Sequence, residues 1–377
     1  MDFSKLTDYL ETLSSVGVPG CDLVVYRDHE PLYRYQAGYR DAALTQPVRD
    51  DDTYNLYSCT KVFTTCAAMQ LIERGKLSLD DAVADYLPAY KSLSVKDGDT
   101  VRPARRVMTV RHLMSMQSGL DYDMETAVIN DAIEALGPAA TTRQLVDAKA
   151  GDPLMFDPGT NFLYSLSHDV LAAVIEVASG KRFSEYLREN IFDPLGLRTI
   201  GFVPTPEIEA RLAEQYVFDD KLKKPVPMPA YANNYRLTPH YESGGAGLIS
   251  DVHDYITFSD ALACGGVGAD GAKILSPEMI QLWSANQLCP EGRRSFDGWH
   301  RLGYSYALGV RTRVDTSIGG KGQIGEFGWD GAAGAYTFID PHKHLSAFYA
   351  MHVRNYGYSY DVIHPTLRSL IYEGLTL

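Results

Sequence analysis

Hydrophobic and polar positions divide the chain into three stretches, and the first predicts a helix and a hairpin. Residues 1–16 space apolar positions between four charged ones, which predicts an amphipathic surface helix and not a secretory signal. Two short β-prone runs follow, at residues 23–26 and 32–35, on either side of a turn-type cluster at residues 28–31. The beginning of the chain is therefore expected to supply the first strands of a sheet.

Helical periodicity dominates the middle of the chain, and strand patterns return near its end. From residue 62 to about residue 201, long amphipathic runs end at Gly75, Gly119 and Gly180, which are typical C-terminal stops of helices. Further runs have strand character, and Gly residues or an Asp-Pro pair separate them: 304–314, 323–327, 335–339 and 345–352. A last helix is predicted over residues 361–373.

Strands at both ends of the chain with helices between them indicate an α+β fold. We expect an antiparallel β-sheet that is built from both chain ends and flanked by helices, with a helical domain inserted. Residues 1–60 and 240–377 would form the sheet domain, and residues 61–239 the mainly helical domain. The active site is expected in the cleft between these two domains.

Composition and charge narrow the range of partners. Hydrophobic residues make up 45% of the 377 residues and charged residues 22%, as in ordinary globular proteins. The formal net charge of -13 argues against a nucleic-acid partner, because such proteins need clustered Lys and Arg to displace counterions. No stretch has the length and apolarity of a membrane span, so no membrane partner is expected, and without a signal sequence the expected location is cytoplasmic.

Cysteine and histidine spacing predicts neither a metal site nor a cofactor. The cysteines are widely spaced without a C-x-x-C pair and are expected to be reduced thiols: Cys21, Cys59, Cys66, Cys264 and Cys289. The ten histidines form no H-E-x-x-H motif. Chemistry that depends on a metal therefore has no support in the sequence.

Ser58 and Lys61 are the candidate nucleophile and base. The run over residues 57–72 is apolar nearly all round, as in a buried central helix, and Ser58 stands at its start. Free N–H groups and the positive dipole end of such a helix would stabilise an oxyanion beside this serine. Positions i and i+3 share a helix face, so the Lys61 amine can reach the Ser58 hydroxyl. Burial can lower the pKa of this amine enough for the amine to accept a proton.

A purely structural interpretation of the same pair is open as well. Ser58 could cap the helix while Lys61 extends towards solvent, and roughly one S-x-x-K match arises by chance in a chain of this length. Two observations favour catalysis: this is the only S-x-x-K in the chain, and Lys61 stands among apolar residues.

Three further stretches accompany Ser58-Cys59-Thr60-Lys61: GKLSLDD at residues 75–81, TVRHLMSMQSGL at 109–120 and FDPGTNFLYSL at 156–166. Together they resemble the serine β-lactamase and penicillin-binding protein superfamily, specifically its class C β-lactamase-like esterases of the family VIII carboxylesterase type. The resemblance covers most of the chain. It implies a β-lactamase/transpeptidase-like fold and an acyl-enzyme mechanism.

By this resemblance, Tyr164 corresponds to the family's tyrosine in a motif usually written Y-x-N. Its hydroxyl would pass the proton from the nucleophile to the leaving group. Leu166 stands where the β-lactamases have an Asn that binds substrate amides, a loss that esterases of the family tolerate. The literal Y-x-N at residues 231–233 is rejected, because the Pro-Gly-Thr lead-in and the following helix belong to Tyr164.

The third family motif corresponds to Trp329-Asp330-Gly331, which resembles the Trp-Gly-Gly of esterase members. The resemblance implies that the backbone N–H groups of Ala332 and Ser58 form the oxyanion hole and that Trp329 and Gly331 contact the substrate. Small residues suit this place, since the substrate must approach the backbone closely.

The expected chemistry is acyl transfer on a small-molecule ester or amide: Ser58 attacks a carbonyl, and water or an alcohol releases the acyl group. A carboxylesterase or transesterase is preferred, because Trp329 lacks the cationic or hydroxylated group that holds the carboxylate of β-lactams. The alternatives are a β-lactamase, a D-amino-acid-type peptidase, and a catalytically silent binding or scaffold homologue.

Substrate selectivity is expected to lie in loops at about residues 121–150, 205–243 and 284–303. An aromatic wall near the cleft would favour apolar acyl groups. The candidate members of this wall are Tyr122, Tyr231, Tyr235, Tyr241 and Trp329.

Overall fold

The helices and strands are those of a computed structural model, which describes residues 1–229, 233–299 and 301–376. The α-helices are α1 (Ser4–Thr12), α2 (Thr60–Glu73), α3 (Val110–Met114), α4 (Ala127–Leu136), α5 (Thr142–Lys149), α6 (Ser167–Ser179), α7 (Phe183–Leu187), α8 (Pro206–Arg211), α9 (Val252–Ala263), α10 (Pro277–Ser284), α11 (Pro290–Asp297) and α12 (His364–Gly374). The strands are β1 (Gly20–Arg27), β2 (Glu30–Gly38), β3 (Thr53–Asn55), β4 (Ser94–Asp97), β5 (Thr100–Pro103), β6 (Gln215–Asp219), β7 (Lys224–Met228), β8 (Ile249–Asp251), β9 (Tyr304–Tyr306), β10 (Arg311–Arg313), β11 (Phe327–Gly328), β12 (Tyr336–Asp340), β13 (Leu345–Met351) and β14 (Val353–Arg354).

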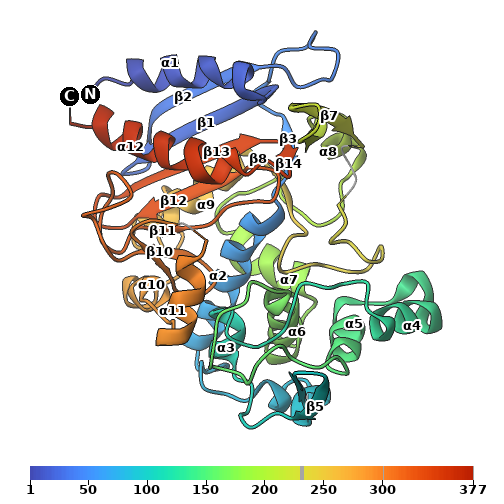
Figure 1. The fold of residues 1–377 in the computed structure, drawn as a ribbon. Coiled ribbons are helices and arrows are strands. Elements are labelled where there is room, and N and C mark those ends of the chain that lie inside the picture. Colours follow the sequence, from blue (N-terminus) through green and yellow to red (C-terminus); the bar gives the residue numbers. More distant parts are fainter. Residues whose placement is uncertain (230–232, 300, 377) are drawn as a thin grey trace.

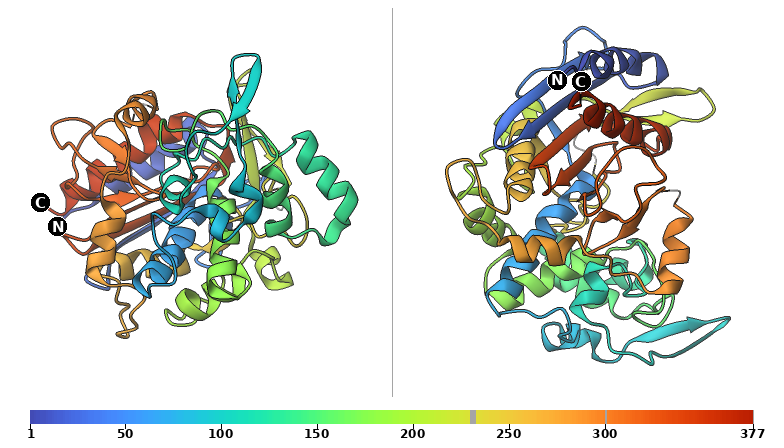
Figure 2. Two further views of the ribbon diagram at one scale, coloured as in Figure 1. Left: turned by 90° about the horizontal axis from the view of Figure 1, so that it is seen from below. Right: turned by 90° about the vertical axis from the view of Figure 1, so that its left-hand side faces the viewer.

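A seven-stranded sheet draws its strands from both ends of the chain, as the sequence predicts. Its order is β2-β1-β13-β12-β11-β10-β9, and each neighbouring pair is antiparallel. The two termini lie close together at one side of the molecule (Figures 1 and 2). There the N–H of Asp2 donates to the carbonyl of Gly374 over 3.0 Å. The α+β fold class is confirmed.

Alternating residues of the sheet pack against helices on opposite faces. Leu23 and Val25 of β1 join the apolar cluster formed with α1 and α12. Val24, between them, pairs with Phe348 of β13, whose ring stacks on Tyr255 of α9 at 3.9 Å. One face of the sheet is thus covered by α1 and α12 and the other by α9 (Figure 1). This alternation is what the period of two in a strand requires.

Helix α2 leads from the sheet into the helical part of the chain (Figure 1). Its residues from Thr60 to Leu71 are all buried, which explains the apolar character of this segment on every side. The ring of Phe63 stacks on Phe258 of α9 at 3.8 Å, and α2 also packs against α6 and α7. The helix therefore fixes the position of its own N-terminal turn, where Ser58 lies.

Several sequence expectations about the elements need correction. The run 304–314 is not one strand but two, β9 and β10, because Gly309 turns the chain with a φ of 74°. Gly119 does not end a helix, since α3 stops at Met114. Glu30 and Pro31 belong to β2 and not to the turn; Pro31 is tolerated there because β2 is an edge strand.

The middle of the chain is mainly helical, but it also holds the β4–β5 hairpin and strands β6 and β7. Strand β6 pairs with β7 on one side and with β14 on the other. The two-domain division at residues 60 and 239 stays a prediction. Over the described residues, none of the helices combines the length and the apolarity that crossing a membrane requires.

Candidate active site

Ser58 lies in the short turn between strand β3 and helix α2. The chain leaves β3 through Leu56 and forms a 3-10 turn over Tyr57–Cys59, directly before α2 begins at Thr60. Tyr57 has a φ of 46°, a left-handed conformation that is rare for a bulky residue and that often marks a functional turn. Its buried hydroxyl donates to Gln215 at 2.6 Å, which holds the turn in place.

Lys61 lies next to Ser58 and is completely buried. Its Nζ is 3.1 Å from Ser58 Oγ, 2.8 Å from the carbonyl oxygen of Gly245 and 3.3 Å from the Tyr122 hydroxyl. Burial lowers the pKa of the Lys61 amine to about 7, although the Asp169 carboxylate acts in the opposite direction. A substantial fraction of this amine is therefore uncharged near neutral pH and can accept a proton.

Tyr164 and Trp329 form a second pair beside Ser58. The Trp329 indole N–H donates to the Tyr164 hydroxyl at 2.9 Å, and the two rings lie 5.5 Å apart. Burial raises the pKa of Tyr164 well above its ordinary value, although hydrogen bonding to Ser58 and Trp329 lowers it in part. The hydroxyl thus keeps its proton at neutral pH and is available as a proton donor.

A cavity of about 550 Å³ opens over Ser58. Of the residues expected at the site, it is lined by Ser58, Tyr122, Tyr164, Tyr235, Trp329, Gly331 and Ala332. The structure also places there Trp299, Arg301, Asp330, Gly357, Tyr360 and Asp361, for which the sequence analysis assigned no role in substrate binding. Trp299 and Arg301 fall within a loop that was expected to carry selectivity, whereas residues 357–361 are brought in only by the tertiary fold.

The structure corrects one member of the expected aromatic wall and leaves another outside the described residues. Tyr241 is 4% exposed and does not line the cavity; its hydroxyl faces the buried Asp169 carboxylate. Tyr231 belongs to residues 230–232, which the structure does not describe. The wall that is present pairs Tyr122 with Tyr164 and with Tyr235, at ring distances of 5.7 and 5.3 Å.

The segment that follows Trp329 presses against the Ser58 turn. A Cβ on Gly331 would lie 2.4 Å from the carbonyl oxygen of Leu56, so only glycine allows this approach of the two backbones. The next residue, Ala332, has an N–H that donates to no other group among the described residues. It is thus free to bind an oxygen of a substrate in the cavity.

Comparison with known proteins identifies the family of this chain. The model of one protein family, described as Beta-lactamase, matches residues 6–370. The chain belongs to the beta-lactamase family. It is a serine hydrolase.

Two relatives and one solved structure illustrate the similarity. Protein Rv1367c of Mycobacterium tuberculosis is 30% identical over 344 residues, which cover 88% of this chain and 84% of the relative. Esterase EstB of Burkholderia gladioli is 29% identical over 349 residues, covering 85% and 82%. The structure of EstCE1, described as a hydrolase with promiscuous acyltransferase activity, superposes with a TM-score of 0.81 at 26% identity over 98% of both chains.

Beyond the motifs of the beta-lactamase family, the structure adds Asp169 to the surroundings of Lys61. This carboxylate lies in the first turn of α6, is fully buried, and interacts electrostatically with Lys61. A Cβ on Gly245 would lie 2.7 Å from its Oδ2 and 3.4 Å from Lys61 Nζ, so Gly245 separates the two groups. The polar pair His168-Asp169 directly before the apolar run at residues 170–175 was the available sequence signal.

Asp169→Asn is expected to shift the pH dependence of the reaction. In the wild type, kcat/KM should rise with pH as the Lys61 amine loses its proton, since burial lowers its pKa to about 7. The Asp169 charge favours the ammonium form of Lys61. Removal of this charge should therefore lower the Lys61 pKa further and shift the rise of kcat/KM to lower pH. The pH profile of ester hydrolysis measures the shift.

Asp260→Asn is the matched control for this experiment, because Asp260 is also buried but lies on α9 and binds His29 instead. Its pH profile should coincide with that of the wild type. If kcat/KM of Asp169→Asn rose over the same pH range as that of the wild type, the Asp169 carboxylate would not influence the pKa of Lys61.

Proposed function

We propose that the protein is a carboxylesterase or transesterase that forms an acyl-enzyme on Ser58. The observation that carries the proposal is the 3.1 Å between Ser58 Oγ and the Nζ of the completely buried Lys61. An uncharged amine at this distance can take the hydroxyl proton while the oxygen attacks an ester carbonyl. A surface lysine, which stays charged, could not.

In the proposed reaction, a bond forms between Ser58 Oγ and the carbonyl carbon as Lys61 accepts the proton. The carbonyl oxygen becomes an oxyanion, for which the N–H groups of Ser58 and Ala332 would supply hydrogen bonds. The bond between the carbonyl carbon and the leaving alkoxide would then break as Tyr164 donates its proton to that alkoxide, and the Lys61 ammonium would return a proton to Tyr164. Water or a second alcohol releases the acyl group by the reverse steps, which gives an acid or a new ester.

The names of the relatives support both hydrolysis and acyl transfer to an alcohol. EstB is named an esterase, CalJ of Penicillium decumbens an acyltransferase, and EstCE1 a hydrolase with acyltransferase activity. In the present chain the 550 Å³ cavity is open to a second substrate after the first product leaves. We infer that the balance between hydrolysis and transfer depends on which acceptor, water or alcohol, occupies this space.

The cavity wall favours esters over β-lactams. The Trp329 N–H is already engaged by Tyr164, and Leu166, at the place of the β-lactamase Asn, is 2% exposed and apolar. Among the described residues that line the cavity, Arg301 is the cationic side chain, and Asp330 pairs with it at 2.6 Å. The described wall therefore offers no unpaired cation to the carboxylate of a β-lactam.

A substrate panel tests the proposal. We expect kcat/KM for the best p-nitrophenyl ester, in a series from acetate to longer acyl chains, to exceed that for a chromogenic cephalosporin by at least about 100-fold. The apolar aromatic wall should make activity rise from acetate to butyrate. Cephalosporin turnover equal to that of the best ester would favour the β-lactamase alternative, and preference for a D-alanyl peptide would favour the peptidase.

A further inference from the structure

Asp330, the middle residue of Trp329-Asp330-Gly331, is a buried carboxylate held by two arginines. It is 6% exposed; its Oδ2 lies 2.6 Å from Arg301 Nη2 and its Oδ1 lies 2.8 Å from Arg311 Nη1. Burial alone would raise the pKa of this carboxyl, but the two guanidinium groups outweigh it and lower the pKa below the ordinary value. Asp330 is therefore a fixed negative charge.

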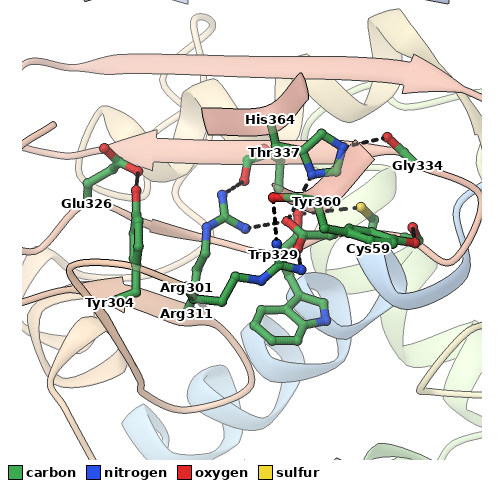
Figure 3. Close-up of polar contacts among 12 residues, drawn as sticks. Cys59, Arg301, Tyr304, Arg311, Glu326, Trp329, Gly334, Thr337, Tyr360 and His364 are labelled. Carbon is green, nitrogen blue, oxygen red and sulfur yellow. Dashed lines mark hydrogen bonds and ion pairs between the residues drawn. The ribbon is translucent and has the colours of Figure 1, made fainter. Parts of the chain in front are cut away.

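The two arginines approach from different elements and are themselves held. Arg311, on β10, also donates to the Thr337 carbonyl of β12 at 2.7 Å, and it is 3% exposed. Arg301, in the loop before β9, also donates to the Tyr360 carbonyl at 3.0 Å. Figure 3 shows Arg301 and Arg311 converging beside Trp329. Because each carboxylate oxygen has its own arginine, both the position and the rotation of the Asp330 side chain are set.

The same segment carries the groups that face the reacting atoms. Trp329, one residue before Asp330, donates its indole N–H to Tyr164, and its carbonyl accepts a contact from Cys59 Sγ at 3.7 Å, next to Ser58. Gly331, one residue after, accepts a hydrogen bond from the Tyr360 hydroxyl at 3.0 Å. The free N–H of Ala332 follows. Asp330 thus connects a rigid sheet to groups that must be placed accurately for catalysis.

We propose that Asp330 is a positioning residue, whose ion pairs with Arg301 and Arg311 hold the Ala332 N–H and the Trp329 indole in their orientation towards the transition state. The inference rests on the proposed acyl transfer at Ser58. A shift of this segment by a fraction of an ångström would lengthen the hydrogen bond to the oxyanion, which forms only in the transition state. Loss of the ion pairs should therefore lower kcat and leave KM nearly unchanged.

A merely structural ion pair is the competing explanation, and the sheet supplies a matched control for it. Asp22 on β1 is 1% exposed and accepts two hydrogen bonds from Arg34, at 3.2 and 2.7 Å, as well as one from Gln36. It belongs to the same sheet but does not line the cavity. Asp22→Asn should lower the Tm and leave kcat unchanged.

The experiment compares Asp330→Asn with Asp22→Asn and the wild type in Tm, in kcat and KM for p-nitrophenyl butyrate, and in the rate of fluorophosphonate labelling. We expect Asp330→Asn to lower kcat by about 10- to 100-fold with KM within about threefold, and to slow labelling in parallel. Equal loss of Tm in both variants with an unchanged kcat and labelling rate in Asp330→Asn would overturn the inference.

Arg311 provides a second test that does not depend on the folding of Asp330→Asn. Arg311→Lys retains a charge that can reach one carboxylate oxygen, so it should keep a larger share of wild-type kcat than Arg311→Met. Equal kcat in the two variants would count against the inference. Failure of the wild type itself to hydrolyse esters or to label would contradict the proposed function, and the inference with it.

Discussion

Replacing Ser58 by alanine is expected to lower ester turnover by on the order of 10⁴-fold or more, because no acyl-enzyme can then form. The substitution removes one oxygen from a side chain that is 8% exposed and leaves the backbone turn and the Lys61 amine in place. Its effect on folding should be small. The Tm, measured beside kcat on p-nitrophenyl butyrate, separates loss of chemistry from loss of structure.

Ser259→Ala is the control for this substitution. Ser259 is fully buried on α9, and its hydroxyl lies 3.3 Å from that of Thr337, away from the described cavity lining. Turnover by this variant should stay within a few-fold of the wild type. If Ser58→Ala retained wild-type turnover, another residue would have to be the nucleophile and the site would have to be sought elsewhere.

Replacing Lys61 by methionine is expected to lower kcat by on the order of 10³-fold or more, because the base beside Ser58 is lost. Methionine has a similar length and needs no burial of an amine, so the Tm should be unchanged or raised. Lys61→Arg distinguishes a base from a mere positive charge. A guanidinium stays protonated in proteins, so this variant should be inactive at every pH that the fold tolerates.

Lys149 offers the contrasting case of a buried lysine outside the site. Its Nζ forms ion pairs with Asp121 and Asp152 at 2.8 and 2.9 Å, and the residue is 1% exposed. Lys149→Met should lower the Tm because it leaves two carboxylates without their partner, but kcat should remain near the wild-type value. Wild-type kcat in Lys61→Met would contradict the assignment of the base.

The part of the site that lies within one short segment of the chain could be predicted from the sequence. The i and i+3 spacing of Ser58, in the 3-10 turn, and Lys61, in the first turn of α2, fixes their distance almost independently of the rest of the fold, and the structure brings the two side chains together. The sheet formed by both chain ends followed equally from strand patterns before residue 40 and after residue 304. These features depend on local periodicity.

Features that depend on tertiary contacts were missed or misplaced. Gly309 divides the run 304–314 with its turn, and only a glycine fits there, because a Cβ would lie 2.1 and 2.6 Å from side-chain atoms of Thr65 and His168. Nothing in the local pattern shows that contact. Tyr241 was expected in the cavity, yet it is buried beside the Asp169 carboxylate.

The arginine partners of Asp330 show the same limit of local reasoning. Arg301 and Arg311 come from two elements that meet only after the sheet has formed, so the sequence does not reveal which of the 35 basic residues neutralise this carboxylate. A charged residue beside a Gly-rich run in an apolar context is the signal that could have suggested a buried ion pair.

Intact-mass analysis after treatment with a fluorophosphonate probe, followed by peptide mapping, identifies the nucleophilic serine. We expect one adduct per chain in the wild type, located on the peptide that contains Ser58, and none in Ser58→Ala under the same conditions. Labelling that persists in Ser58→Ala, or an adduct on a different serine of the wild type, would contradict it.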